Sequence, residues 1–175
     1  MERKAALAAF EAARSEWEQA FARVPDLALG YLKPGDDYSL GGLQVHVNWV
    51  LEHYNRILGA ILAFRFQNTI GPQDPDGAEV RARETMREGL SPQERPGAID
   101  RMHRLHQETR VACTNLVDED WDRKAQVVYG EGEDPDPTSP ADIVGWLTDH
   151  YREHVQQSAQ LIEEWSATGS QPAQT

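Results

Sequence analysis

The sequence predicts an all-α protein, built as a single bundle of four helices. Four long segments place apolar residues three and four positions apart, which is the periodicity of an amphipathic helix. No stretch alternates apolar and polar residues convincingly, as a half-buried strand does. With 175 residues the chain can bury one sizeable core, and helices of this length bury their apolar faces most simply against one another.

The first two helices are expected over Glu2–Arg23 and Ser39–Asn68. The first is rich in alanine and carries large apolar residues on one side, and Pro25 ends it because proline cannot continue a helix. The second begins with a serine, which caps helix N-termini well, and continues with a stripe of Leu, Val and Ile. His46 and His53 lie seven residues apart along one border of this stripe.

The third helix is expected over Pro96–Leu116, after a weakly structured segment that is rich in proline and glycine. Within that segment, residues 71–96, a short charged helix is expected near Ala78–Arg87. The inner face of the third helix is unusually polar and includes His106. The third helix therefore brings polar groups as well as apolar ones to the bundle.

The fourth helix is expected from Ser139 to Trp165, and three signals agree on its start. Ser139 is a good N-cap, Pro140 suits the first helical position, and Asp142 in the first turn complements the helix dipole. The residues that follow this helix are polar. We therefore expect one domain over residues 1–167 and a disordered tail over residues 168–175.

Two histidines one helical turn apart are the most informative residues of the chain. His150 and His154 point the same way as the apolar residues of the fourth helix, so both rings lie within its buried stripe. A buried polar ring without a partner costs free energy, and two imidazoles at this spacing can share one metal ion. The alternative is two core histidines that bond to neighbouring hydroxyl groups or carboxylates. We favour the metal, because two such rings occur together.

A third metal ligand is expected from another helix. His46 is the first choice, because it lies early in the second helix and we expect the second and fourth helices to be parallel neighbours. His53 and His106 could also reach the site, and they are the candidates for a general base. The arginines weighed as donors for an anionic cofactor, each with a solvated position as the alternative, are Arg56, Arg65, Arg101 and Arg104.

Three other motif interpretations fail on position or on residue count. The string from His150 to His154 matches the H-x-x-E-H pattern of inverted zinc peptidases, but that class needs an acidic ligand well downstream and only 21 residues follow His154. Glu153, the base in that interpretation, points away from the two histidines. A di-iron carboxylate bundle needs two Glu-x-x-His motifs, and the sequence has none. The lone Cys113 is typical of an inert core residue.

The residues around these histidines resemble the DinB-like family, which includes YfiT-like proteins. Tyr38-Ser39-Leu-Gly-Gly-Leu-Gln-Val-His46-Val resembles the start of that family's second helix, where a Trp-Ser pair is followed by histidine. The segment from Asp149 to His154 resembles its H-x-x-x-H helix, and LVDEDWDRKA resembles the connection before it. The resemblance covers roughly residues 5–165. Tyr38 replaces the usual Trp, and Gly71–Pro96 is longer than expected, which could reshape the mouth of the site.

The resemblance implies an up-down-down-up four-helix bundle, often dimeric, in which three histidines hold a divalent metal ion such as nickel, zinc, iron or manganese. Carried over by position, these ligands are His46, His150 and His154. Some relatives are thiol S-transferases or isomerases, including a mycothiol-dependent maleylpyruvate isomerase, and use a low-molecular-weight thiol such as mycothiol or bacillithiol. The resemblance therefore favours a metal-dependent thiol S-transferase, or a related transferase or hydrolase, that acts on a small molecule. The alternative is a non-catalytic, stress-related bundle in which the metal is structural or absent.

Composition excludes several other classes of protein. The net charge of −12 repels phosphate backbones and no basic patch offsets it, so nucleic-acid binding is not expected. Cys113 is the only cysteine, which excludes an internal disulfide and fits a reducing compartment. The sequence shows no secretory signal and no apolar run of membrane-spanning length. We therefore expect a cytoplasmic homodimer that binds a small molecule, and not a membrane.

Overall fold

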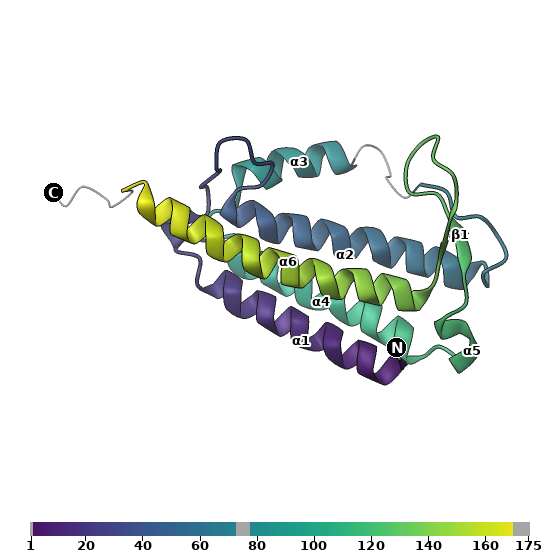
Figure 1. Ribbon diagram of the computed structural model, residues 1–175. Helices are drawn as coiled ribbons and strands as arrows, with labels where there is room; N and C mark the ends of the chain where they lie inside the picture. Colours follow the sequence, from purple (N-terminus) through teal and green to yellow (C-terminus); the bar gives the residue numbers. More distant parts are fainter. Residues whose placement is uncertain (1, 73–77, 170–175) are drawn as a thin grey trace.

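Four long helices form the body of the protein, as the sequence predicts. The computed structural model describes residues 2–72 and 78–169. The bundle helices are α1 (Arg3–Ala22), α2 (Leu40–Ala63), α4 (Arg95–Thr114) and α6 (Pro140–Ala167). In Figure 1, α1 and α6 run toward the left and α2 and α4 toward the right, which is the up-down-down-up order. The helix α1 packs chiefly on α6, while α2 packs on both α4 and α6.

A buried chain of polar side chains fixes how α2 is rotated in the bundle. The indole N–H of Trp17 on α1 donates to Oε1 of Gln44 on α2 at 2.9 Å. Nε2 of Gln44 donates to Asn48 at 3.0 Å, and Nδ2 of Asn48 donates to the Ala98 carbonyl on α4 at 2.9 Å. Because these buried groups would lose their partners if α2 turned, the chain sets the direction in which His46, between Gln44 and Asn48, projects.

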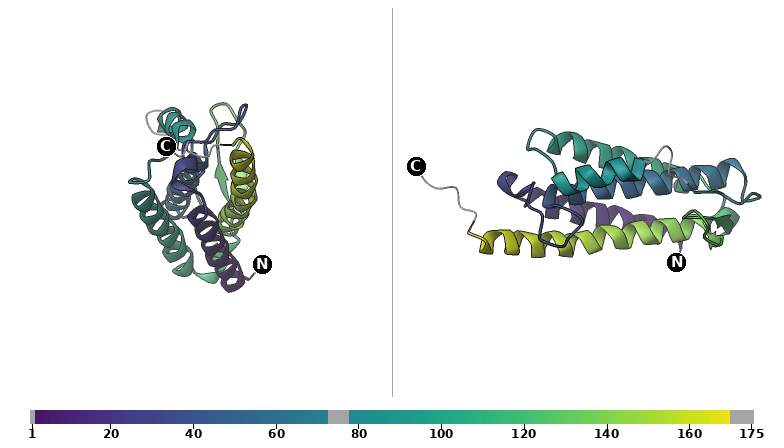
Figure 2. Two further views of the ribbon diagram at one scale, coloured as in Figure 1. Left: turned by 90° about the vertical axis from the view of Figure 1, so that its left-hand side faces the viewer. Right: turned by 90° about the horizontal axis from the view of Figure 1, so that it is seen from above.

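The short charged helix expected near residues 78–87 is α3 (Ala78–Glu88), and it docks on the start of α2. Figure 2 shows α3 outside the four-helix bundle, along α2. The Met86 carbonyl near the end of α3 accepts hydrogen bonds from the Ser39 N–H at 2.9 Å and from the Ser39 hydroxyl at 3.2 Å. The main chains come so close that a Cβ on Gly42 would lie 1.7 Å from the Met86 oxygen. We call this contact the α2–α3 joint.

The second helix is shorter than predicted, since α2 ends at Ala63 and not at Asn68. Its end is a left-handed turn in which Arg65 and Phe66 have φ of 50° and 62°. The Phe66 N–H donates to the Ile61 carbonyl at 3.0 Å, which satisfies one of the last carbonyls of the helix. Such turns usually carry glycine, so the pattern that marks most helix ends is missing here.

The expectation that the chain contains no strand is wrong in one place. β1 (Ala125–Val127) pairs antiparallel with β2 (Asp136–Thr138), and Ile70 adds an isolated bridge to Val127. Each strand has three residues, which is too short for an alternating pattern to be detected. Two smaller helical segments, η1 (Asp26–Ala28) and α5 (Asp118–Trp121), complete the connections.

The remaining boundaries agree closely with those predicted. Ser139 caps the start of α6. Its hydroxyl accepts a hydrogen bond from the Asp142 N–H, and the Asp142 carboxylate accepts one from the Ser139 N–H at 2.8 Å. Residues 73–77 of the segment before the third bundle helix, and residues 170–175 of the predicted tail, lie outside the described residues. Among residues 2–72 and 78–169, no helix is both long and apolar enough to cross a membrane.

Candidate metal centre

The three histidines singled out by the sequence lie together between α2 and α6. One ring nitrogen from each of His46, His150 and His154 falls within 4.8 Å of the other two. The ring centroid of His46 is 4.9 Å from that of His150 and 5.1 Å from that of His154. Three imidazole nitrogens that converge on one point are a donor set for a single divalent ion.

The helices that carry these ligands are antiparallel, so the expectation of parallel neighbours is wrong. His46 on α2 faces His154 on α6, whereas Tyr54, further along α2, faces Trp146, which lies earlier on α6, with ring centroids 5.9 Å apart. In the up-down-down-up order, α6 returns along α2 in the opposite direction (Figure 1). His46 still meets the pair because α6 is 28 residues long and carries His154 near its middle.

Hydrogen bonds and stacking hold the rings in place. Nδ1 of His154 lies 2.8 Å from Oε1 of Gln157, and because an amide oxygen only accepts, Nδ1 carries the proton. This leaves Nε2 of His154 as a lone-pair donor, 3.2 Å from Nε2 of His150. The ring of His46 stacks on Tyr38 with centroids 4.3 Å apart. Its Nδ1 is buried and has no hydrogen-bond partner among the described residues.

All three histidines are held in the neutral form. Burial, reinforced by the neighbouring histidines, lowers the pKa of His46 to about 4 and that of His150 to about 3. Burial also lowers the pKa of His154, although the hydrogen bond to Gln157 opposes this. A neutral imidazole has a free lone pair and an imidazolium has none, so the site is ready to bind a metal at neutral pH.

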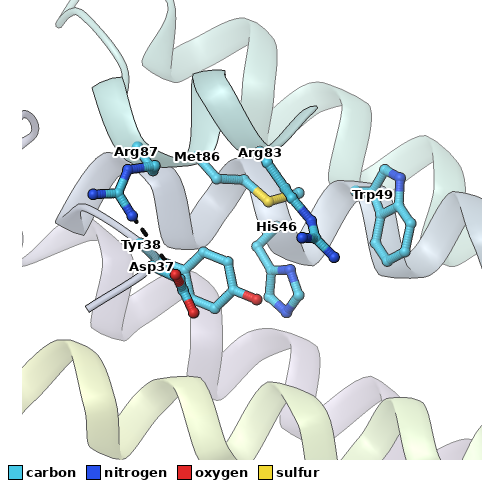
Figure 3. Close-up of a pocket in the computed structure, with 7 residues that line it drawn as sticks. All are labelled: Asp37, Tyr38, His46, Trp49, Arg83, Met86 and Arg87. Atoms are coloured by element: carbon cyan, nitrogen blue, oxygen red, sulfur yellow. Dashed lines mark ion pairs between the residues drawn. The ribbon is translucent and has the colours of Figure 1, made fainter. Parts of the chain in front are cut away.

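Two pockets border the three histidines. The first, about 360 Å³ in volume, we call the arginine pocket (Figure 3); it is lined by Asp37, Tyr38, His46, Trp49, Arg83, Met86 and Arg87. The second, about 450 Å³, we call the aromatic pocket; its lining includes Trp49, His53, Tyr54, Trp146, Asp149 and His150. Trp49 lines both pockets. Each pocket therefore reaches one histidine of the cluster, His46 in the first and His150 in the second.

His53 and His106, the two further histidines that were expected to reach the site, lie in different parts of the structure. His53 lines the aromatic pocket beside His150 and stacks on Trp49 with ring centroids 5.3 Å apart. His106 lies instead between α1 and α4, where its Nε2 donates to the Glu11 carboxylate at 3.1 Å and its ring stacks on Phe10 at 4.0 Å. Within the described part of the chain, His106 is not part of the lining of either pocket. The expectation that it could reach the site is wrong.

The buried position of His106 gives it a structural partner on each side. A carboxylate can only accept, so Nε2 donates to Glu11, and Nδ1 then accepts from the Tyr151 hydroxyl at 3.4 Å. Burial lowers the pKa of His106 to about 4, although Glu11 opposes the shift. His106 is therefore a neutral core residue that joins α1, α4 and α6.

The arginines that line the site are not those suggested by the sequence. Arg56 and Arg101 pair with Glu52, and Arg104 lies beside Glu108 on another face of the bundle. Arg83 and Arg87 line the arginine pocket instead. Both belong to α3, and no local pattern of the sequence predicts that this helix docks on α2.

The comparison with known proteins agrees with the fold. The family model described as the DinB superfamily matches residues 9–158. This stretch begins in α1 and contains His46, His150 and His154. A search of curated proteins found no significant match.

Proposed function

The chain belongs to the DinB superfamily, and on that premise we propose that it binds one divalent metal ion through His46, His150 and His154 and transfers a thiol to a small electrophilic molecule. The observation that carries the proposal is the convergence of three neutral imidazoles at a point that two pockets reach. Structural metal sites are closed by four protein ligands, whereas catalytic sites keep a position open. A three-histidine site between two pockets fits the open kind.

The donor set suits nickel, zinc or iron, since imidazole is a preferred ligand of each of them, and manganese remains a candidate by the family resemblance alone. The bound ion would supply Lewis acidity and lower the pKa of a thiol or a water molecule that binds to it. A low-molecular-weight thiol is the cofactor that we propose. The two pockets provide separate space for the thiol and for the molecule that receives it.

The residues of the chain itself would position the ligands and exclude water. Gln157 holds the His154 ring through Nδ1, and Tyr38 supports the His46 ring by stacking. The indole of Trp49 forms an apolar wall on both sides of the centre. In the proposed transfer the thiol sulfur forms a bond to the electrophilic carbon, the bond from that carbon to its leaving group breaks, and the leaving group departs with the electron pair, as chloride does from chlorodinitrobenzene. The thiol proton is lost at the same time, so a base is needed. His53, in the aromatic pocket, is the residue that we propose for this proton.

Cys113 supports this division of roles because it is not suited to act as the nucleophile. Its side chain is fully buried, and burial raises the pKa of the thiol to about 12. A thiol with such a pKa is protonated at neutral pH and unreactive. The nucleophilic sulfur of the proposed reaction would therefore come from a bound small molecule.

A cytoplasmic location and a homodimer are further parts of the proposal. A single buried cysteine fits a reducing compartment. Trp146 is 42% exposed, and an exposed tryptophan on a bundle helix favours an interface between subunits. Size-exclusion chromatography with light scattering, on the protein with and without metal, would give the number of subunits.

Metal analysis of untagged protein purified without chelator tests the proposal. We expect about one metal ion per chain in the wild type and none in the His150→Ala/His154→Ala double variant. The matched control is His103→Ala, because His103 is half-exposed and contacts Glu18 on α1, away from the site. Failure to bind nickel, zinc, iron or manganese would overturn the proposal.

Activity separates the transferase from the alternative in which the metal only stabilises the bundle. The metal-loaded protein would be assayed for conjugation of low-molecular-weight thiols to an electrophile such as chlorodinitrobenzene. We expect a rate that depends on both metal and thiol and that is lost in the double variant. A protein that binds metal, unfolds at lower temperature without it and conjugates no thiol would support the structural role.

A further inference from the structure

The arginine pocket has features of an anion-binding site that the metal centre alone does not require. We propose that it binds the anionic group of a small organic acid, a carboxylate or a phosphate, through Arg83 and Arg87. The inference rests on the proposed function, because the metal centre would hold the other end of the same molecule. It assigns a class of ligand to the centre.

The positions of the two arginines follow from the way α3 is attached. Arg83 and Arg87 lie one helical turn apart, so they project from the same face of α3. The α2–α3 joint fixes this helix over the start of α2, where His46 also lies. Figure 3 shows Arg83 extending toward His46 and Trp49, while Arg87 lies against Asp37. Both guanidinium groups therefore border the same space as one of the metal ligands.

The charges in the lining favour an anion. Two guanidinium groups and one carboxylate, that of Asp37, line the pocket among the described residues. Asp37 lies 3.6 Å from Nη1 of Arg87, and its side chain is 84% exposed. Two cationic side chains thus border one pocket of a chain whose net charge is −12. A divalent ion at the three neutral histidines would add positive charge beside them.

The aromatic pocket is lined by acidic side chains instead of basic ones. Asp149 and Glu153 line the aromatic pocket, together with Trp49, Tyr54 and Trp146. An anionic group is repelled by these carboxylates and attracted by the guanidinium groups of the arginine pocket. The difference in charge between the two pockets would thus orient a ligand that has one anionic end.

The size of the pocket indicates a small molecule. Its volume of about 360 Å³ lies near the lower end of the range of roughly 300–1,000 Å³ found for small-molecule sites. Tyr38 and Trp49 supply flat apolar walls, and the arginines supply donors that match carboxylate and phosphate oxygens. This combination of walls and donors fits a short chain with an oxyanion at its end.

Thiol probes of graded length test the inference on zinc-loaded protein. Mercaptoacetate, 3-mercaptopropionate and 6-mercaptohexanoate would each be compared with the corresponding amide by calorimetry. The thiol end is common to both members of a pair, so the ratio of their affinities reports recognition of the carboxylate. We expect the acid to bind about tenfold more tightly than the amide at the best chain length, which corresponds to about 1.4 kcal/mol.

Three variants connect that ratio of affinities to the named residues. In Arg83→Gln/Arg87→Gln we expect the preference for the acid to disappear. Arg81→Gln is the matched control, since it removes the same charge from the same helix outside the pocket lining, and it should keep the preference. Asp37→Asn removes the competing carboxylate and should strengthen binding of the acid about threefold. Competition by acetate and by inorganic phosphate would show which oxyanion the arginines prefer.

The outcomes separate this inference from the function on which it rests. Zinc content and thermal stability would be measured on every sample, and the exposure of Arg87 and Asp37 predicts that the variants fold. An unchanged preference in Arg83→Gln/Arg87→Gln, with zinc bound, would overturn the inference and leave the metal site standing. Absence of bound zinc in the wild type would overturn the proposed function, and the inference with it.

Discussion

The lowered pKa values of the histidines predict that metal binding resists mild acid. Lowering the pH from 7.5 to 5.5 protonates an ordinary histidine, which then cannot bind a metal. In the folded protein, burial lowers the pKa of His46 to about 4 and that of His150 to about 3. A folded-state pKa below the ordinary value keeps the neutral form present throughout the interval between the two. The metal-binding form therefore survives at pH 5.5.

The size of the effect follows from the fraction of each ring that is neutral. An ordinary histidine with a pKa near 6.5 loses roughly tenfold in its neutral fraction between pH 7.5 and pH 5.5, and two together lose about a hundredfold. With pKa values of about 4 and about 3, His46 and His150 stay more than about 95% neutral at pH 5.5. The pKa of His154 is also lowered, so this ring loses less of its neutral form than an ordinary histidine does. We therefore expect the zinc affinity to fall by less than about tenfold, which is the loss from one ordinary histidine.

Calorimetry with zinc measures both the affinity and the protons released. At pH 6.5, titrations in two buffers with different ionisation enthalpies would give the number of protons displaced per ion. Three ordinary histidines would release about 1.5 protons in total at this pH, and we expect less than about 0.5, the share of one ordinary histidine. Proton release near one, or a loss of affinity of about a hundredfold at pH 5.5, would refute the conclusion that these rings are neutral before the metal binds.

Three further substitutions and one chemical reaction test other parts of the structure. Gly42→Ala should destabilise the protein by about 1–3 kcal/mol and weaken binding of the acid probes, because its Cβ would collide with a carbonyl of α3. Gly59→Ala on the same helix meets no atom within 4 Å, so it should raise the melting temperature, with a gain of about 0.5–1 kcal/mol; destabilisation by both would contradict the α2–α3 joint. His106→Ala should cost about 2–4 kcal/mol in urea unfolding, because it leaves a cavity and the Glu11 contact is lost, yet bind metal like the wild type. Cys113 should react with a disulfide reagent only after unfolding, since a rise in thiol pKa from 9.0 to about 12 lowers the thiolate fraction about a thousandfold; fast labelling of the folded protein would argue against its burial.

The bundle and its histidine cluster could be predicted because both depend on helical periodicity. His150 and His154 are one turn apart on a helix with clear capping residues, so their common direction follows from the sequence. The meeting with His46 required knowledge of how α2 and α6 pack, and the assumed parallel direction was wrong. The ligand was nevertheless identified, because its position at the edge of the apolar stripe depends on α2 alone.

Features that depend on contacts between segments could not be predicted. The end of α2 is formed by Arg65 in a left-handed conformation that glycine usually adopts, so composition did not mark it. The strands β1 and β2 are stabilised by pairing with each other over three residues, too few for a pattern. The arginine pocket exists because α3 folds back on α2, and a charged helix carries no sign of where it docks. His106 was expected only as a residue that could also reach the site, because its face of α4 is buried, and burial does not indicate against which helix a side chain packs.

The α2–α3 joint has a consequence for how ligand preference could be altered. The helices meet main chain to main chain at Gly42 and Met86, so a side chain added there would move α3 as a whole relative to α2. Substitution at the joint would therefore change many contacts together, whereas Arg83 and Arg87 are exposed residues of α3. Directed evolution toward neutral or cationic ligands would therefore succeed by randomising these two positions with the joint unchanged. The bundle would remain unchanged, and the side chains of α3 would determine which ligand binds.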